Sequence, residues 1–307
     1  MNTRILFSFV LSAVLCACGG QPTQQATTAK PAVDPRGPDA MLVDAMRRHT
    51  QQGDFAAALQ LVKSAAEKAP DRKDIVWLYS QLCSQANGCQ PESAESHLRK
   101  QDPQNAAVWL GPLSRARLRK DVAAENEILE AMSRAERFDI YWNSIVSKMA
   151  LVASADVAAH LGPTTPDVVT TSLNDVIGWL SAVDLPRFAP LSESCSAART
   201  TNPTIAARCA KIANVLMNGD SYIAESVGLG IAERLAPANS PQAVQIAERI
   251  KRARYQRDIA GQIIAGQLER DKFSRELIKL MATQRREQDV FLAVIRWGGQ
   301  PTEPGSN

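Results

Sequence analysis

Residues 53–70 read Gly-Asp-Phe-Ala-Ala-Ala-Leu-Gln-Leu-Val-Lys-Ser-Ala-Ala-Glu-Lys-Ala-Pro. The alanine-rich centre predicts a helix, with Gly53-Asp54 as a turn before it and Pro70 as its end. The whole chain shares this character, because alanine is frequent and aromatic residues make up only 5% of the sequence. After residue 40 the sequence contains no convincing alternation of apolar and polar residues that would predict a strand. We therefore expect an all-α fold.

The same stretch resembles the second helix of a tetratricopeptide repeat. In this resemblance Gly53-Asp54 is the turn between the two helices of a pair, and Pro70 closes the unit. Ala65 then lies at the close crossing, where only a small side chain lets two helices approach each other. Three further residues of this helix would face the partner helix: Phe55, Ala58 and Val62.

Neighbouring segments resemble the repeat less closely. In the first helix, Met41 to Gln52, Leu42 and His49 stand where the family has Trp and Tyr. Further units are expected at residues 75–102 and 107–137, and in the latter Lys120-Asp121 takes the place of Gly53-Asp54. The resemblance implies a right-handed helical-repeat solenoid with tetratricopeptide-like repeats over residues 39–161. Three helix pairs are about the minimum for such a stack.

The rest of the chain predicts more helices. The segment from Gly162 to Pro166 is expected to interrupt the helical pattern. Thr165 can cap the next helix, with Pro166 at its first position. Residues 162–297 are expected to form either a C-terminal helical domain or a continuation of the solenoid, and residues 298–307 a disordered tail. Four helices are expected after residue 205, at about 209–217, 224–235, 240–264 and 271–297. The pair Gly228 and Gly230 predicts a tight helix crossing.

The N-terminus contains Leu15-Cys16-Ala17-Cys18 after an apolar run from Ile5 to Leu15. That run is too short to span a bilayer and has the length of a signal-peptide core. It resembles the lipobox of bacterial lipoproteins, which implies a signal peptide over residues 1–17 and a lipid, such as palmitate, on Cys18. Gly19 in place of Asp then implies the outer membrane, with the protein on its periplasmic face. Residues 18–38 are expected to form a disordered tether, with a reach of roughly 25 Å.

Four cysteines remain after the N-terminal pair: Cys83, Cys89, Cys195 and Cys209. An even number in an exported protein predicts disulfides, and three pairings are possible. Two local bonds are favoured, because Asn87-Gly88 forms a turn signal inside the first pair and Asn202 lies midway in the second. A metal site made of all four is disfavoured, since the sequence contains no CxxC spacing.

Signatures of catalysis and of cofactor binding are absent from the sequence. The three histidines, His49, His97 and His160, have no metal-ligand spacing, and neither a GxSxG elbow nor a phosphate loop occurs. We therefore expect no metal, no cofactor and no enzymatic activity. A solvated, ion-paired helix face is expected to hold Glu125, Glu127 and Glu130.

The 35 basic and 32 acidic residues nearly balance, which argues against nucleic acid as a partner. Packing between helices is the first interpretation of Trp77 and Trp109, and lining of a binding groove is the second. In the basic segment 249–257, Arg257 interrupts an apolar stripe and needs a partner or a ligand.

The expected function is docking or scaffolding of an envelope protein or peptide, with Trp77, Trp109 and Arg257 as candidate binding residues. A second hypothesis is binding of peptidoglycan or lipopolysaccharide. A third is hydrolysis of cell wall or peptide.

Overall fold

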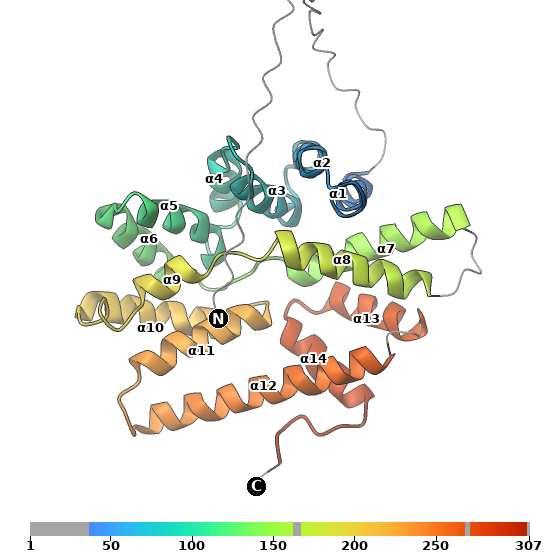
Figure 1. The fold of residues 1–307 in the computed structure, drawn as a ribbon. Coiled ribbons are helices and arrows are strands. Elements are labelled where there is room, and N and C mark those ends of the chain that lie inside the picture. Colours follow the sequence, from blue (N-terminus) through green and yellow to red (C-terminus); the bar gives the residue numbers. More distant parts are fainter. Residues whose placement is uncertain (1–36, 162–166, 268–270, 306–307) are drawn as a thin grey trace, which may run out of the picture. The chain divides into compact units, whose positions relative to one another are not determined.

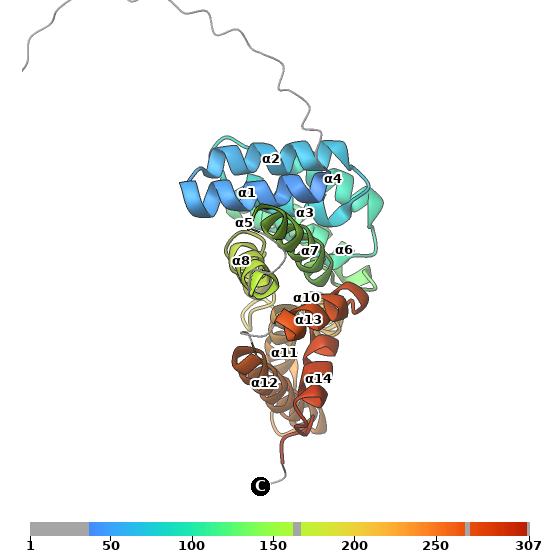
Figure 2. The ribbon, with the colours of Figure 1, turned by 90° about the vertical axis from the view of Figure 1, so that its right-hand side faces the viewer.

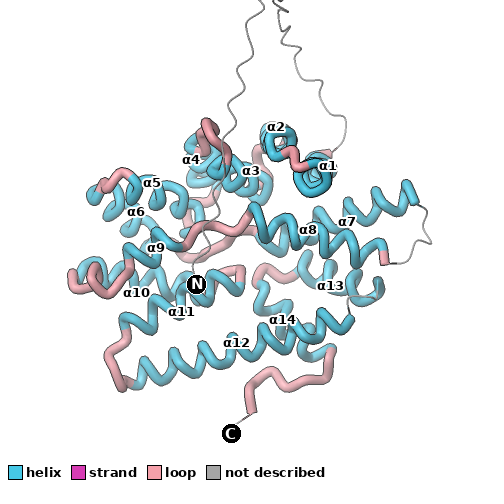
Figure 3. The backbone as a smooth tube through the Cα atoms, viewed as in Figure 1, coloured by secondary structure: helices cyan, strands magenta, loops and turns pink. Residues whose placement is uncertain are grey.

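The computed structural model describes residues 37–161, 167–267 and 271–305, which belong to one compact unit. Over these residues the backbone forms fourteen α-helices and one short 3-10 helix, with no β-strand (Figure 1, Figure 3). The predicted all-α class is confirmed. Within the described residues, no helix combines the length and the apolar character that crossing a bilayer requires. The signal peptide, Cys18, nearly all of the tether and Thr165-Pro166 lie outside the described residues.

The N-terminal half consists of three successive helical hairpins. The first joins α1 (Pro38–Gln52) to α2 (Phe55–Lys68), and the second joins α3 (Lys73–Gln85) to α4 (Glu92–Gln101). In the third, the 3-10 helix η1 (Ala106–Trp109) and α5 (Leu110–Leu118) lead to α6 (Val122–Arg134). The face predicted for α2 is buried, because Ala58, Val62 and Ala65 have no exposed surface.

Two of the hairpin turns have the same geometry. Gly53 has φ +67°, and the Asp54 carboxylate accepts the N–H of Ala57 at 2.9 Å, capping α2. In the third hairpin Lys120 has φ +55°, and Asp121 accepts the N–H of Ala124 at 3.0 Å, capping α6. The predicted correspondence of the two turns is confirmed, although Lys120 adopts a left-handed conformation that favours glycine.

The second half continues with α7 (Trp142–Leu161), α8 (Val168–Val183), α9 (Ala189–Ser194), α10 (Pro203–Met217), α11 (Tyr222–Leu235), α12 (Pro241–Gln267), α13 (Asp271–Thr283) and α14 (Glu287–Trp297). Helix α10 packs on α6, and α11 connects α10 to α12. Helix α13 packs on α7 and α8, which in turn contact α1 and α3 (Figure 1, Figure 2). One continuous hydrophobic core joins both halves.

The predicted close crossing at Gly228 is confirmed. A Cβ atom at this position would lie 2.7 Å from the backbone nitrogen of Met217 and 2.8 Å from the carbonyl oxygen of Ala213. Both atoms belong to α10, so α11 approaches α10 backbone to backbone at this point. Only glycine leaves room for this contact.

The prediction of one helix over residues 271–297 is wrong, because α13 ends at Thr283 and α14 begins at Glu287. Hydrogen bonds to distant parts of the chain stabilise this break between α13 and α14. The Gln284 carbonyl accepts Asn143 Nδ2 at 2.9 Å, Arg286 Nε donates to the Gly219 carbonyl at 3.2 Å, and the Glu287 N–H donates to the Asp220 carbonyl at 2.7 Å. No glycine or proline marks the break, so the local sequence did not signal it.

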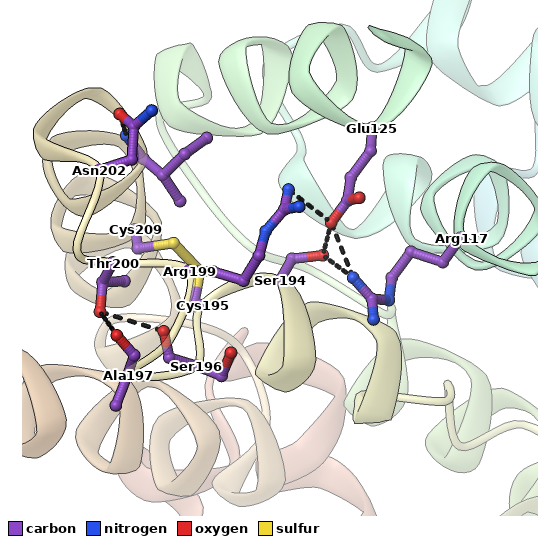
Figure 4. The surroundings of a disulfide bond; sticks show 11 residues. Arg117, Glu125, Ser194, Cys195, Ser196, Ala197, Arg199, Thr200, Asn202 and Cys209 are labelled. Atoms are coloured by element: carbon purple, nitrogen blue, oxygen red, sulfur yellow. Dashed lines mark hydrogen bonds and ion pairs between the residues drawn. A yellow bond between two sulfur atoms is a disulfide. The ribbon is translucent and has the colours of Figure 1, made fainter. Parts of the chain in front are cut away.

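The predicted disulfide pairing is confirmed. Cys83 and Cys89 have an S–S distance of 2.05 Å across the turn at Gly88, which has φ +78°. Cys195 and Cys209 have an S–S distance of 2.00 Å and tie the end of α9 to α10 (Figure 4). Helix α9 was not among the predicted helices. It begins with Ala189-Pro190, and proline in the first turn suits a helix start.

The expectation of a solvated glutamate face is wrong for Glu125, which is buried. Its Oε1 accepts Arg117 Nη1 at 2.8 Å and Ser194 Oγ at 2.5 Å, and it lies 3.3 Å from Arg199 Nη2. Figure 4 shows these groups converging beside the Cys195–Cys209 bond. The carboxylate therefore links α5 and α6 to α9 and to the loop that the disulfide closes. Glu130 keeps the expected ion pairs, with Arg134 and Arg208.

Lys120→Gly should stabilise the protein. Glycine relieves the left-handed strain at φ +55°, so we expect the free energy of unfolding to rise by about 0.5–1 kcal/mol. Gly53→Ala, the matched change in the first hairpin, should lower it by about 1 kcal/mol. Urea unfolding followed by circular dichroism measures both, and a loss of stability in Lys120→Gly would contradict the strain argument.

Removal of the two disulfides should have unequal effects. The Cys195–Cys209 loop spans 14 residues and the Cys83–Cys89 loop spans 6, so the first bond restricts the unfolded chain more. For the Cys195→Ala/Cys209→Ala double variant we expect a loss of about 3 kcal/mol and a Tm lower by roughly 5–10 °C. The Cys83→Ala/Cys89→Ala variant should lose less. Equal melting temperatures in calorimetry would show that loop closure does not set the difference.

Candidate functional site

The first helices of the three hairpins, α1, α3 and α5, share a face, which we call the first-helix face. Other parts of the chain cover much of it. Helices α7 and α8 contact α1 and α3, and α9 contacts α5. Two polar contacts illustrate the cover: Trp179 Nε1 donates to His49 Nδ1 at 3.0 Å, and Gln85 Nε2 donates to the Val183 carbonyl at 2.8 Å. Much of this face is therefore closed to a separate partner.

Trp77 lies beneath this cover with 2% of its surface exposed, so no ligand can contact it in this structure. Its ring is edge-on to that of Tyr141, with the centroids 6.4 Å apart. Packing, the first interpretation of this residue, is what the structure shows. This burial gives no support to its assignment as a binding residue, which stays a prediction.

Two buried aspartates lie near Trp77 in different environments. Burial acts to raise the pKa of Asp74, but the hydrogen bonds and charges of Arg72 and Lys148 outweigh it and hold the pKa below the ordinary value. Asp184 has no exposed surface, and neither carboxylate oxygen has a hydrogen bond of normal geometry within the described residues. Burial raises the pKa of Asp184 well above 3.8, Asp74 adds to this, and the Trp77 indole N–H offsets it only in part.

Trp109 and Arg257, the other two candidate binding residues, lie elsewhere. The Arg99 guanidinium covers the half-buried ring of Trp109 at 5.3 Å from its centroid. Arg257 lies on α12 with a 47% exposed side chain, 2.5 Å from Asp258 and 5.0 Å from the centroid of the Tyr222 ring. The partner expected for this cation is thus a neighbouring carboxylate and an aromatic ring. The structure does not bring Trp77, Trp109 and Arg257 together.

The part of the first-helix face that stays open is a cavity of about 270 Å³ between α3, the start of α4, α5 and the segment after α8. We name it the α3–α5 cavity. Six of its lining residues represent these elements: Ser80, Glu92, Leu110, Arg115, Leu118 and Pro186. Leu118 is 80% exposed at its rim, and Cys89 places the Cys83–Cys89 disulfide at its wall.

The charges in the cavity wall are held in place. Arg115 forms a two-pronged ion pair with the buried Glu95 carboxylate and lies 3.2 Å from Glu92. The hydrogen bond with Glu95 raises the pKa of Arg115 above its ordinary value, so this side chain stays charged. A Cβ atom at Gly111 would lie 2.1 Å from Glu95 Oε1, so glycine is needed for the carboxylate to lie against α5.

The sequence analysis missed a pair of buried carboxyl groups, Asp139 and Asp220. Burial and the neighbouring Asp139 raise the pKa of Asp220 well above 3.8. Asp139 borders a cavity of about 260 Å³ together with Tyr141, whose φ is +61°. Asp220 is 1% exposed and its Oδ2 accepts the N–H groups of Ile140 and Trp142, so it holds backbone rather than substrate. In the sequence, Asn218-Gly219-Asp220 is typical of a turn between two helices and gives no signal that Asp220 is buried.

Metal and histidine chemistry gain no support from the described residues, which contain no group of three or more His, Cys, Asp or Glu arranged to hold a metal ion. His49 contacts Trp179, His97 the Pro70 carbonyl and His160 the Asp156 carbonyl. No protein-family model and no curated protein matches this chain. Its function has to be inferred from the cavities and charges, because a helical fold alone does not determine an activity.

Asp184→Asn should stabilise the protein at neutral and alkaline pH. Because the pKa of Asp184 is higher in the folded than in the unfolded protein, the folded state binds this proton more tightly, and the free energy of unfolding falls as the pH rises from about 3.8 through the folded pKa. An uncharged amide removes this loss. We expect a Tm a few degrees above wild type at pH 8, with the gain shrinking toward pH 4.

Thermal unfolding between pH 4 and pH 8 measures this difference. Asp258→Asn is the control, because it makes the same change of charge at an exposed position on α12. A gain for Asp184→Asn that is the same at every pH, or a loss at pH 8, would contradict the assigned ionisation.

Proposed function

We propose that this chain is an outer-membrane lipoprotein, anchored through a lipid on Cys18, that docks an extended segment of a partner protein on the periplasmic side. The lipobox-like sequence before Cys18 supports the anchor. The proposal includes a right-handed, tetratricopeptide-like solenoid. Three consecutive hairpins support it, and the packing of α10 on α6 extends the row with a fourth, α10 and α11. Stacked hairpins of this kind present surfaces that suit peptide ligands.

The observation that carries the docking proposal is the path of residues 184–188. This segment connects α8 to α9 without helical structure (Figure 1). Its residues Pro186 and Arg187 line the same cavity as α3 and α5. The first-helix face therefore accommodates an extended backbone, here one from the same chain. Beside it the cavity remains open, with exposed Leu118 at its edge. A partner segment with an apolar side chain next to Leu118 fits this surface.

The two alternative functions stay predictions. Arg249 and Arg252 line a common cavity but Arg257 does not, and no aromatic ring lines it, so the geometry gives no specific support to a peptidoglycan or lipopolysaccharide site. A hydrolase would need an accessible nucleophile and base. The one carboxyl pair described above has its inner member, Asp220, buried and engaged by backbone N–H groups.

Site-specific cross-linking in cells tests the docking proposal. A photo-reactive amino acid at position 118 should give a reproducible adduct with one envelope protein. The same group at Val244, an exposed apolar position on α12, should not. Leu118→Glu should abolish co-purification of that partner without lowering Tm, because the side chain is exposed. Identical adducts from both positions, or none from position 118, would contradict docking at the cavity.

The anchor is tested separately in the same cells. Cys18→Ala should move the protein from the membrane fraction to the soluble fraction. A variant that stays with the membrane would refute the lipid anchor and leave the docking test unaffected.

A further inference from the structure

Another cavity, of about 400 Å³, lies between α12, α14 and the C-terminal segment, away from the residues that line the α3–α5 cavity. Four arginines line it, and we name it the arginine cleft: Arg249, Arg252, Arg286 and Arg296. Three carboxylates also line it: Glu225, Asp289 and Glu303. Glu303 belongs to the C-terminal segment itself. The permanent walls therefore hold four cations and two anions.

The four arginines are not equally compensated. Arg249 is neutralised by the buried Glu225, at 3.0 Å, and so forms a fixed part of the wall. Arg286 donates to the Gly219 carbonyl, which leaves its charge uncompensated. The Arg296 side chain has no hydrogen bond or ion pair with any described residue. The cleft therefore presents positive charge that attracts an acidic group.

The C-terminal segment occupies this cleft without regular secondary structure, and its backbone bends at Thr302 and Glu303. Gly299, with φ +65°, turns the backbone after α14, and residues 300–305 then follow α12. Three consecutive residues make polar contacts: the Pro301 carbonyl accepts Tyr255 Oη at 3.0 Å, the Thr302 carbonyl accepts Gln256 Nε2 at 2.9 Å, and the Glu303 carboxylate lies 3.2 Å from Arg252 Nε.

The contacts on the helix side form a regular row. Arg252, Tyr255 and Gln256 are spaced i, i+3 and i+4, so they project from one face of α12. Two of them bind backbone carbonyls, which every peptide offers, and the third binds a carboxylate. This row matches a peptide with two successive backbone carbonyls followed by an acidic side chain. A phosphate or a lipid headgroup offers no such series of carbonyls.

The segment is held weakly enough to be exchanged. Glu303 is 62% and Arg252 49% exposed, and an ion pair at such a surface contributes about 0–1 kcal/mol. Most residues from 300 to 305 remain exposed, so little apolar surface holds them in place. A competing segment has only these few contacts to replace.

We propose that the arginine cleft is a binding site for an acidic, non-helical peptide segment of a partner protein, and that residues 300–305 occupy it as an intramolecular competitor. Arg252 binds the acidic side chain, Tyr255 and Gln256 bind the backbone, and Arg286 and Arg296 supply the attracting charge. The site is independent of the α3–α5 cavity, so either one can fail without the other.

Peptide binding to the full chain tests this site. The probe is a fluorescein-labelled peptide with the sequence of residues 298–307, Gly-Gly-Gln-Pro-Thr-Glu-Pro-Gly-Ser-Asn. Glu303→Lys in the protein places a like charge beside Arg252 and releases the competitor. We expect this variant to bind the probe at least about tenfold more tightly than wild type by fluorescence anisotropy.

Matched variants in the Glu303→Lys background locate the site. Arg252→Gln should weaken probe binding at least about tenfold. Arg254→Gln, an exposed arginine on the same helix that does not line the cleft, should leave it unchanged. A probe with Gln in place of its Glu should bind more weakly.

Three outcomes would overturn the proposal. The first is a Glu303→Lys protein that has an unchanged circular dichroism spectrum but does not bind the probe, and the second is an equal loss of probe affinity in Arg252→Gln and Arg254→Gln. The third is Arg252-dependent binding of phosphatidylglycerol vesicles or inorganic phosphate without binding of the peptide. The last outcome would assign the cleft to a phosphate group instead.

Discussion

One buried residue, Asp220, forms hydrogen bonds with three connections between helices, and the arrangement of the helices depends on these bonds. Its Oδ2 accepts the N–H groups of Ile140 and Trp142, and its own N–H donates to the Phe138 carbonyl. Its carbonyl accepts the N–H of Glu287 at the start of α14. The link from α6 to α7, the turn from α10 to α11 and the start of α14 therefore meet at one residue. Without these bonds several buried backbone groups would lack partners, at a cost of about 1–3 kcal/mol each.

Other buried polar groups extend this junction. The Asn105 side chain accepts the N–H of Asp139 at 2.9 Å and donates to its carbonyl at 2.8 Å, which fixes the link before α7 to the start of η1. Tyr141, in a left-handed conformation, is held by its hydroxyl on Asp102 at 2.6 Å. The direction in which α7 leaves toward α1 and α3 follows from these bonds, and so does the cover over the first-helix face. Such networks stabilise only when their members are satisfied, which makes this junction sensitive to single changes.

Local chemistry explains how much of the fold the sequence could predict. Gly53-Asp54, Lys120-Asp121, the Cys83–Cys89 turn and the Gly228 crossing depend on residues close in the chain, and each was predicted. The break between α13 and α14, the burial of Glu125 and the cover over Trp77 were not predicted. Each depends on groups that lie 60 or more residues away, such as Gly219 for Arg286 and Ser194 for Glu125. Helical periodicity shows which face of a helix is apolar, but it does not identify the element that packs against that face.

Segments of the chain itself lie on both candidate binding surfaces, and this affects how a partner can bind there. Both candidate surfaces hold a non-helical segment of the same chain: residues 184–188 at the α3–α5 cavity and residues 300–305 in the arginine cleft. A partner that competes with such a segment binds only the molecules in which the surface is free. Its apparent affinity is therefore the intrinsic affinity multiplied by the fraction of such molecules. The first segment is fixed at both ends by α8 and α9, and its last residue, Phe188, is buried, so it is a permanent part of the surface. The second is held by polar contacts of Pro301, Thr302 and Glu303, in a segment that is mostly exposed. We therefore expect competition to regulate binding at the proposed site in the arginine cleft and not at the α3–α5 cavity.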